Sequence, residues 1–189
     1  MGLLSRVLGR STPPPPTLDA LFALPTAALT IESAMGLRPT GVGSVCFRAA
    51  EGGATRATVT DVEALLEAGG APAVERSVDS FGFTWLLLRR DPVDVSGLVT
   101  DLHAVNATLQ DNGFGPALLC SLMGFADSSG RALGLVYLYK RGTFYPFAPH
   151  GDKARDNAFE LEVRGALGVD LPVEPDLSRW FPLWGAPGL

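Results

Sequence analysis

Apolar residues in the middle of the chain recur with the period of an α-helix. Four of them share one helical face at i, i+4, i+7 and i+11, namely Leu98, Leu102, Val105 and Leu109. Asp94 precedes this stretch as an N-cap, and Asn112 with Gly113 supplies a stop after it. The pattern therefore predicts a helix whose apolar face packs into a core.

Two helices are predicted near the start of the chain. Thr17 is suited to cap a short helix that runs through Leu24. Pro25 fits the first turn of a second helix, because proline needs no amide donor there, and Gly36 ends it.

Two more helices are predicted from capping signals. Thr60 and Glu63 form a capping-box pattern for a helix that ends at residues 69–70. Asp152 is expected to cap the last helix, with three apolar residues facing inward. Those residues are Phe159, Val163 and Leu167, and the ones expected in solvent are Arg155, Glu160, Glu162 and Arg164.

Apolar runs between turn signals predict the strands. They cover residues 42–49, 74–78, 81–89, 116–125, 131–141 and 143–147. Tight turns at residues 79–80 and 127–130 join neighbouring runs, and strands joined so closely pair antiparallel. The expected fold class is α+β, an antiparallel sheet with helices packed on it, in one domain over residues 17–170.

Both ends of the chain have distinct compositions. Residues 1–16 combine a basic amphipathic stretch with four consecutive prolines, which form a stiff spacer. The apolar face of this stretch consists of Leu3, Leu4, Val7 and Leu8. It suits a membrane surface or a partner's groove, and an unstructured terminus is the alternative. Arg6 excludes a myristoylation signal.

Aromatic residues cluster in two late segments. One holds Phe144, Tyr145 and Phe147, and the other holds Trp180, Phe181 and Trp184. Packing within an edge strand and a tail is one interpretation. The other is a partner or membrane-interface anchor, because residues 171–189 are expected to leave the domain as an aromatic tail.

Composition narrows the classes of function. The 189 residues are 47% hydrophobic and only 19% charged, which suits one buried core and some surface covered by a partner. A net charge of −5 with scattered positive residues argues against nucleic-acid binding. Arginine far outnumbers lysine, as in proteins from GC-rich genomes.

The chain offers little reactive chemistry. His103 is expected at the flank of an apolar helix face and His150 at a helix start, with no pairing that would make a catalytic base or a zinc site. Cys46 and Cys120 stand in apolar runs, so we expect buried reduced thiols in a cytoplasmic protein. No apolar run of bilayer-spanning length is evident. No catalytic, cofactor or metal residues are assigned.

Several blocks of the chain, in order, resemble the PspA-associated protein PspAB family. They are LDALFALPTAALTIESAMG, PTGVGSVCFRAAEG, FGFTWLLLRRDP, GLVTDLHAVNATLQDNGFGPALLC and FYPFAP, within residues 18–167. The resemblance implies a cytoplasmic accessory of the phage-shock envelope-stress response that acts with the membrane-remodelling protein PspA, or with a linked HtpX-like membrane peptidase. Actinobacterial or archaeal origin agrees with the arginine bias. The family provides no catalytic residues to carry over.

Three hypotheses of function follow. The leading one is a non-enzymatic adaptor that contacts partners and, at the inner face of the cell membrane, lipid. The second is a chaperone-like module that dimerises and holds an extended client peptide. The order of helices and strands is also similar to that of YbjN and type III secretion chaperone-like domains, a likeness of topology alone. The third is an enzyme of unrecognised type, in which His103 or His150 would matter beyond folding.

Overall fold

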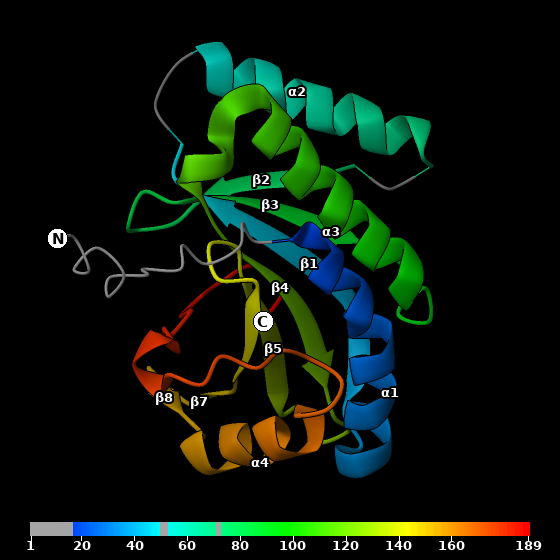
Figure 1. Ribbon diagram of the computed structural model, residues 1–189, viewed down its shortest axis with the longest axis vertical. Helices are drawn as coiled ribbons and strands as arrows, with labels where there is room; N and C mark the ends of the chain where they lie inside the picture. Colours follow the sequence, from blue (N-terminus) through cyan, green and yellow to red (C-terminus); the bar gives the residue numbers. More distant parts are fainter. Residues whose placement is uncertain (1–16, 50–52, 71–72) are drawn as a thin grey trace, which may run out of the picture.

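The computed structural model describes residues 17–49, 53–70 and 73–189. The predicted N-terminal contact residues Leu3, Leu4, Val7 and Leu8 lie outside this part of the chain. The fold is α+β, as the sequence predicts. Its centre is a six-stranded antiparallel sheet with the strand order β2-β3-β1-β4-β5-β6 (Figure 1).

The six predicted strands of the main sheet are present, but β1 begins at residue 38 rather than 42, β3 begins at 84 rather than 81, and β5 ends at 138 rather than 141. The strands of the main sheet are β1 (Arg38–Phe47), β2 (Glu75–Val78), β3 (Thr84–Arg89), β4 (Leu118–Ala126), β5 (Ala132–Leu138) and β6 (Thr143–Phe147), and a small hairpin follows in β7 (Pro149–His150) and β8 (Ala154–Arg155). The helices are η1 (Leu18–Ala23), α1 (Leu24–Met35), α2 (Gly53–Ala68), α3 (Val95–Leu109) and α4 (Asn157–Leu167), with short turns η2 (Gln110–Phe114), η3 (Gly115–Ala117) and η4 (Leu177–Arg179).

Helix α3 crosses the middle of the sheet, and its predicted apolar face is buried in full (Figure 1). Gly43 of β1 makes the close approach feasible, because a Cβ there would lie 3.2 Å from Leu98 and from Leu102. The Asp94 carboxylate accepts a hydrogen bond from Gly97 N at 3.0 Å, which confirms the predicted N-cap. Gly113, with φ of 86°, lies where the sequence predicts a stop.

Removing this cap has a measurable cost. Asp94→Ala is expected to lower the free energy of unfolding by about 1 kcal/mol, because an amide of the first turn loses its acceptor. Urea unfolding is the measurement. Asp94→Asn keeps a capping oxygen and serves as the matched control, and equal losses in the two variants would contradict the capping argument.

Helix α1 ends at Gly36, whose φ of 69° is the left-handed cap expected for glycine. The helical stretch Leu18–Met35 has a mean hydropathy of 1.3 and is long and apolar enough to span a bilayer by length and composition, contrary to the expectation from the sequence. Its apolar side is instead packed into the core of the domain. The buried residues are Leu21, Leu24, Ala27, Ala28 and Ile31.

Two predicted helix starts are wrong. Helix α2 begins at Gly53 rather than Thr60, because Thr60 lies inside the helix and its hydroxyl donates to Arg56 O at 3.1 Å. Helix α4 is capped by Asp156, which accepts from Phe159 N at 3.0 Å, rather than by Asp152 in the turn of the β7–β8 hairpin.

The inward face predicted for α4 is confirmed, but Glu160 is not in solvent as expected. Its carboxylate is buried and accepts two bonds of 3.0 Å from Arg155 Nε. It also accepts a bond of 2.9 Å from Ala148 N. A buried carboxylate is stable here because the guanidinium neutralises its charge and the amide uses another lone pair.

Candidate functional site

The C-terminal tail, residues 171–189, first runs beside the edge strand β6, where Phe144 bridges Val173, and then lies on the face of the sheet opposite α3. The expectation that this tail leaves the domain is not met, because Trp180 is only 5% exposed. Its ring stacks against Tyr145 at 6.0 Å, and its Nε1 donates to Glu174 O at 3.0 Å. The tail folds back because this buries the large apolar indole of Trp180 while its N–H group, the only donor of the ring, keeps a hydrogen bond.

A buried carboxylate fixes the beginning of the tail. Glu174 is 0% exposed and accepts hydrogen bonds from Thr143 Oγ1 at 2.7 Å and from Arg141 Nε at 3.2 Å. The Glu174 carboxylate also accepts hydrogen bonds from Asp176 N at 3.2 Å and from the Arg179 guanidinium at 3.5 Å. Burial acts to raise the pKa of Glu174, but these hydrogen bonds outweigh it and hold the pKa below its usual value.

A second ion pair fixes the start of the aromatic segment. The guanidinium of Arg155, already paired with Glu160, also donates to Trp180 O at 2.6 Å. It therefore joins α4, the β7–β8 hairpin and the tail. Since both anchors bind backbone of the tail as well as side chains, the tail has a defined path over the sheet.

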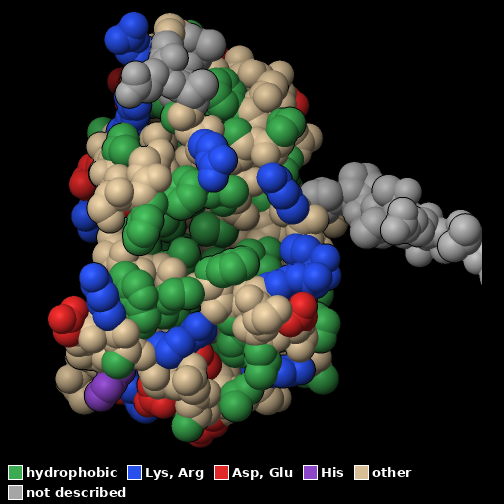
Figure 2. All heavy atoms as spheres, turned by 90° about the vertical axis from the view of Figure 1, so that its left-hand side faces the viewer, with side chains coloured by type: hydrophobic (Ala, Val, Ile, Leu, Met, Phe, Trp, Pro, Cys, Tyr) green, Lys and Arg blue, Asp and Glu red, His purple; other side chains and the backbone are tan. Residues whose placement is uncertain are grey.

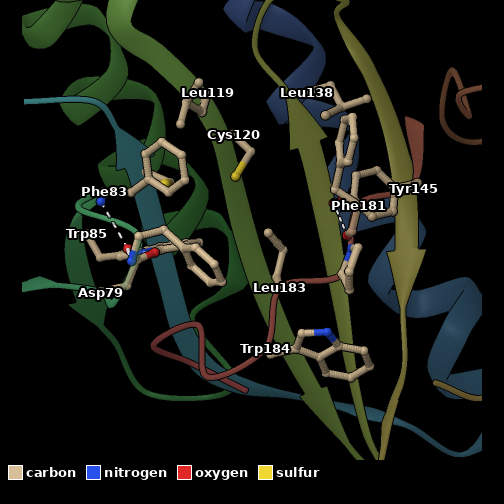
Figure 3. A pocket seen from close by; sticks show the side chains of 13 residues that line it. Asp79, Phe83, Trp85, Leu119, Cys120, Leu138, Tyr145, Phe181, Leu183 and Trp184 are labelled. Carbon is tan, nitrogen blue, oxygen red and sulfur yellow. Dashed lines mark hydrogen bonds between the residues drawn. The ribbon is translucent and has the colours of Figure 1, made fainter. Parts of the chain in front are cut away.

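Between this tail and the strands lies an apolar cavity of about 420 Å³, which we call the tail groove. Aromatic side chains form much of its wall, namely Phe83, Trp85, Tyr145, Phe181 and Trp184 (Figure 3). Figure 2 shows the same face, where hydrophobic side chains gather in a hollow with Lys and Arg side chains around it. A concave apolar site with few polar groups is the usual form of a binding site.

A β-bulge shapes the floor of the tail groove. Cys46 of β1 pairs with Cys120, whereas Phe47 pairs with Leu118, so Leu119 is an extra residue on β4. Leu119 therefore lines the groove beside Cys120, although neighbouring residues of a regular strand point to opposite faces. The bulge thus adds an apolar side chain to the floor.

Asp79 is the single carboxylate among the residues that line the tail groove. Its oxygens accept from Trp85 Nε1 at 3.0 Å and from the amides of Phe81 and Phe83 at 2.9 Å (Figure 3). Burial acts to raise the pKa of Asp79, but the bonds from Trp85 and the amides lower it below its usual value. Asp79 therefore holds the β2–β3 turn as an ionised acceptor and is poorly suited to act as a base.

The mouth of the tail groove is both apolar and basic. Phe81 is 76% exposed and Phe181 is 58% exposed, which is unusual for rings of this size. The Arg48 guanidinium lies 5.6 Å from the centre of the Phe83 ring. Lys and Arg side chains surround the hollow on this face (Figure 2). In a protein of net charge −5, this rim favours an apolar ligand with acidic neighbours.

The structure divides the aromatic residues singled out in the sequence. Tyr145, Phe181 and Trp184 line the tail groove. Phe144 is buried on the helix side of the sheet, and Phe147 is buried against Trp184 with ring centres 5.1 Å apart. Buried rings such as these and Trp180 offer no surface for a partner. They support the interpretation of edge and tail packing.

Sequence reasoning missed Phe83, Trp85 and Leu119 as groove residues. The alternation of β3 does contain a signal, because Phe83 and Trp85 are two residues apart and share a face. The pairing of β1 with both β3 and β4, which brings these residues to the cysteines, has no local signal.

The two histidines lie outside the tail groove. His103 Nε2 is 3.9 Å from Asp19, and its ring lies 4.9 Å from that of Phe22 on the helix side. His150 is exposed in β7 rather than at a helix start. Over residues 17–49, 53–70 and 73–189, no group of three or more His, Cys, Asp or Glu residues is placed to hold a metal ion.

The Tyr145 hydroxyl ties the sheet to the tail by donating to Phe181 O at 2.8 Å. Tyr145→Phe is expected to cost about 1 kcal/mol, because the carbonyl loses its donor while the ring stays packed. Amide hydrogen exchange in residues 178–186 should then accelerate. Tyr139→Phe, which removes a bond to Gln110 on the other face, is the control. Unchanged exchange in the tail would refute this role of Tyr145.

No curated protein and no solved structure matches this chain. A family model does match, and it covers residues 1–188, nearly the whole sequence. Its description is PspA associated protein B, which confirms the resemblance seen in the sequence blocks. The chain therefore belongs to the PspAB family.

Proposed function

We propose that this protein is a non-enzymatic adaptor of a phage-shock-type envelope-stress response and that it binds a PspA-type protein through the tail groove. The observation that carries the proposal is an apolar groove left open on a face that the tail only partly covers. The family description, with its association with PspA, supports the choice of partner.

The groove suits an apolar segment of the partner that has acidic residues beside it. Each leucine or phenylalanine buried in the groove contributes about 1.5–3 kcal/mol. Arg48 at the rim favours acidic neighbours and speeds the encounter of the two proteins. Asp79 and Tyr145 already have hydrogen-bond partners, so neither offers a free polar group to a ligand.

Partner capture tests this proposal. Tagged protein from envelope-stressed cells should recover a PspA-type protein, and the double variant Phe81→Asp/Phe181→Asp should recover it at least about tenfold less, because exposed aromatic anchors carry much of such binding energy. Val169→Asp, at a residue that is 94% exposed and does not line the groove, is the matched control. Equal recovery by the double variant and the control would overturn the proposed surface.

The same proposal places the protein in the cytoplasm, peripheral to the inner face of the cell membrane, with a linked membrane peptidase as a second partner. The amphipathic pattern of residues 1–16 supports membrane contact. Flotation with anionic vesicles, comparing the full chain with a chain that lacks residues 1–16, is the test. Equal flotation of the two would refute a role for this segment.

A chaperone-like function is the second candidate. Strand β2 is at an edge of the sheet, and all four of its residues are exposed. Such an edge can accept an extended client peptide as a further strand. Amide shifts confined to β2 on addition of an unfolded client peptide would support it. The chaperone-like function would be rejected if light scattering showed a strict monomer and the protein captured no such peptide.

A further inference from the structure

Cys46 and Cys120, the only cysteines of the chain, face each other across two strands. They are direct partners in the pairing of β1 with β4. They are 3% and 6% exposed, and both line the tail groove. Figure 3 shows the Cys120 sulfur directed into the cavity. The two thiols are thus shielded from bulk solvent yet open to a small molecule that enters the groove.

The backbone around Cys120 fixes how near the two residues are. Tyr139 N donates to Leu119 O at 3.1 Å, so Cys120 and Leu138 form a non-hydrogen-bonded pair of β4 and β5. The amide and carbonyl of Cys120 then point to β1, which makes Cys46 and Cys120 a hydrogen-bonded pair. Such pairs have Cα atoms about 5.5 Å apart, within the range that a disulfide spans.

The corresponding Cβ separation is less favourable. Opposite Cβ atoms in hydrogen-bonded pairs are about 5.5 Å apart, whereas a disulfide needs roughly 3.5–4.5 Å. The strands must therefore approach by about 1 Å. The bulge at Leu119 lies directly beside the pair, at a point where the ladder is already irregular. A bond formed here would be strained and, for that reason, easily reduced.

We propose that Cys46 and Cys120 form a reversible oxidation site, in which a small uncharged disulfide that enters the tail groove is reduced and a Cys46–Cys120 disulfide forms. One thiolate attacks the oxidant, forms a mixed disulfide and expels one small thiolate. The second cysteine then attacks the mixed disulfide and expels the other. Two electrons pass to the oxidant, and the two cysteine protons end on the two released thiols.

The reduced pair is the resting state. A hydrogen bond with Cys120 and then burial raise the pKa of Cys46, with the charges of Cys120 and Asp79 acting in the same direction. The Cys46 thiolate is therefore scarce at neutral pH, so its exchange with a disulfide is slow. Closure of the bond moves β1 against β4 beneath Leu119 and changes the shape of the groove floor.

Mass spectrometry of the full-length protein tests the proposal. Native protein is incubated with hydroxyethyl disulfide, denatured and treated with iodoacetamide. We expect both thiols to resist alkylation, a mass 2 Da below the reduced chain, and recovery of two alkylated thiols after treatment with dithiothreitol. Two alkylated thiols in protein that circular dichroism shows to be folded, or a stable mixed disulfide with the oxidant, would overturn the proposal.

Single variants assign the site. In Cys46→Ala and Cys120→Ala no internal disulfide can form, so after treatment the remaining cysteine should be either a free thiol or a mixed disulfide with the oxidant. If an alanine variant does not fold, Cys46→Ser or Cys120→Ser takes its place. Tryptophan emission adds a readout of shape, because Trp85 and Trp184 line the groove. It should change on oxidation and revert on reduction, whereas constant emission would refute the change in shape. These results stand whether or not PspA-type capture succeeds.

Discussion

Trp180→Ala is expected to lower the free energy of unfolding by about 3–5 kcal/mol, the usual cost of truncating a large buried aromatic residue. The variant loses the stacking on Tyr145 and the Nε1 bond to Glu174 O. The carbonyl of residue 180 remains bonded to Arg155, but the cavity beneath it has nothing to fill it. Urea unfolding measures the loss.

Amide hydrogen exchange separates local from global effects in this variant. Residues 174–186 should exchange much faster than α3, because the tail is fixed to the sheet through the indole. Phe181→Ala is the matched control, because that neighbouring ring is mostly exposed and its loss should cost less than about 1 kcal/mol. If the two variants lose equal stability, the tail is held by its backbone rather than by the indole.

The sequence predicted those features that depend on neighbours along the chain. Helix α3 is the best case, because its apolar spacing, its cap at Asp94 and its stop at Gly113 all lie within twenty residues. The hairpin of β4 and β5 is equally predictable from the sequence, since one short turn joins the two strands. The fold class follows from such local signals and from the rule that short turns make antiparallel pairs.

The tail groove depends on partners that are distant in sequence, which is why the sequence did not reveal it. Trp180 packs on Tyr145, thirty-five residues earlier, and nothing in either segment specifies that contact. The helical pattern predicts Glu160 on a solvent face, yet Arg155 and Ala148 N make its burial favourable. The bulge at Leu119 also changes which residues share a face, and a pattern of alternation does not show it.

Glu174→Gln is expected to lower the free energy of unfolding at pH 7 by about 3 kcal/mol. The buried carboxylate accepts from Arg141, Thr143 and Arg179, and removal of one member of such a buried ionic cluster is costly. The amide that replaces it has only one acceptor oxygen and turns an NH₂ group toward guanidinium donors. Glu162→Gln, at an exposed position of α4, should stay within about 0.5 kcal/mol of the parent.

Acid unfolding identifies the charge of Glu174 as the cause. Its folded pKa lies below the ordinary value of 4.5, so the unfolded chain binds the proton more readily than the folded protein. The stability that Glu174 contributes is therefore present above pH 4.5 and is lost as the pH falls from there through the folded pKa. The gap between the parent and Glu174→Gln should narrow between pH 5 and pH 3. A gap that stays constant over this range would mean that shape, not charge, makes this carboxylate important for holding the tail.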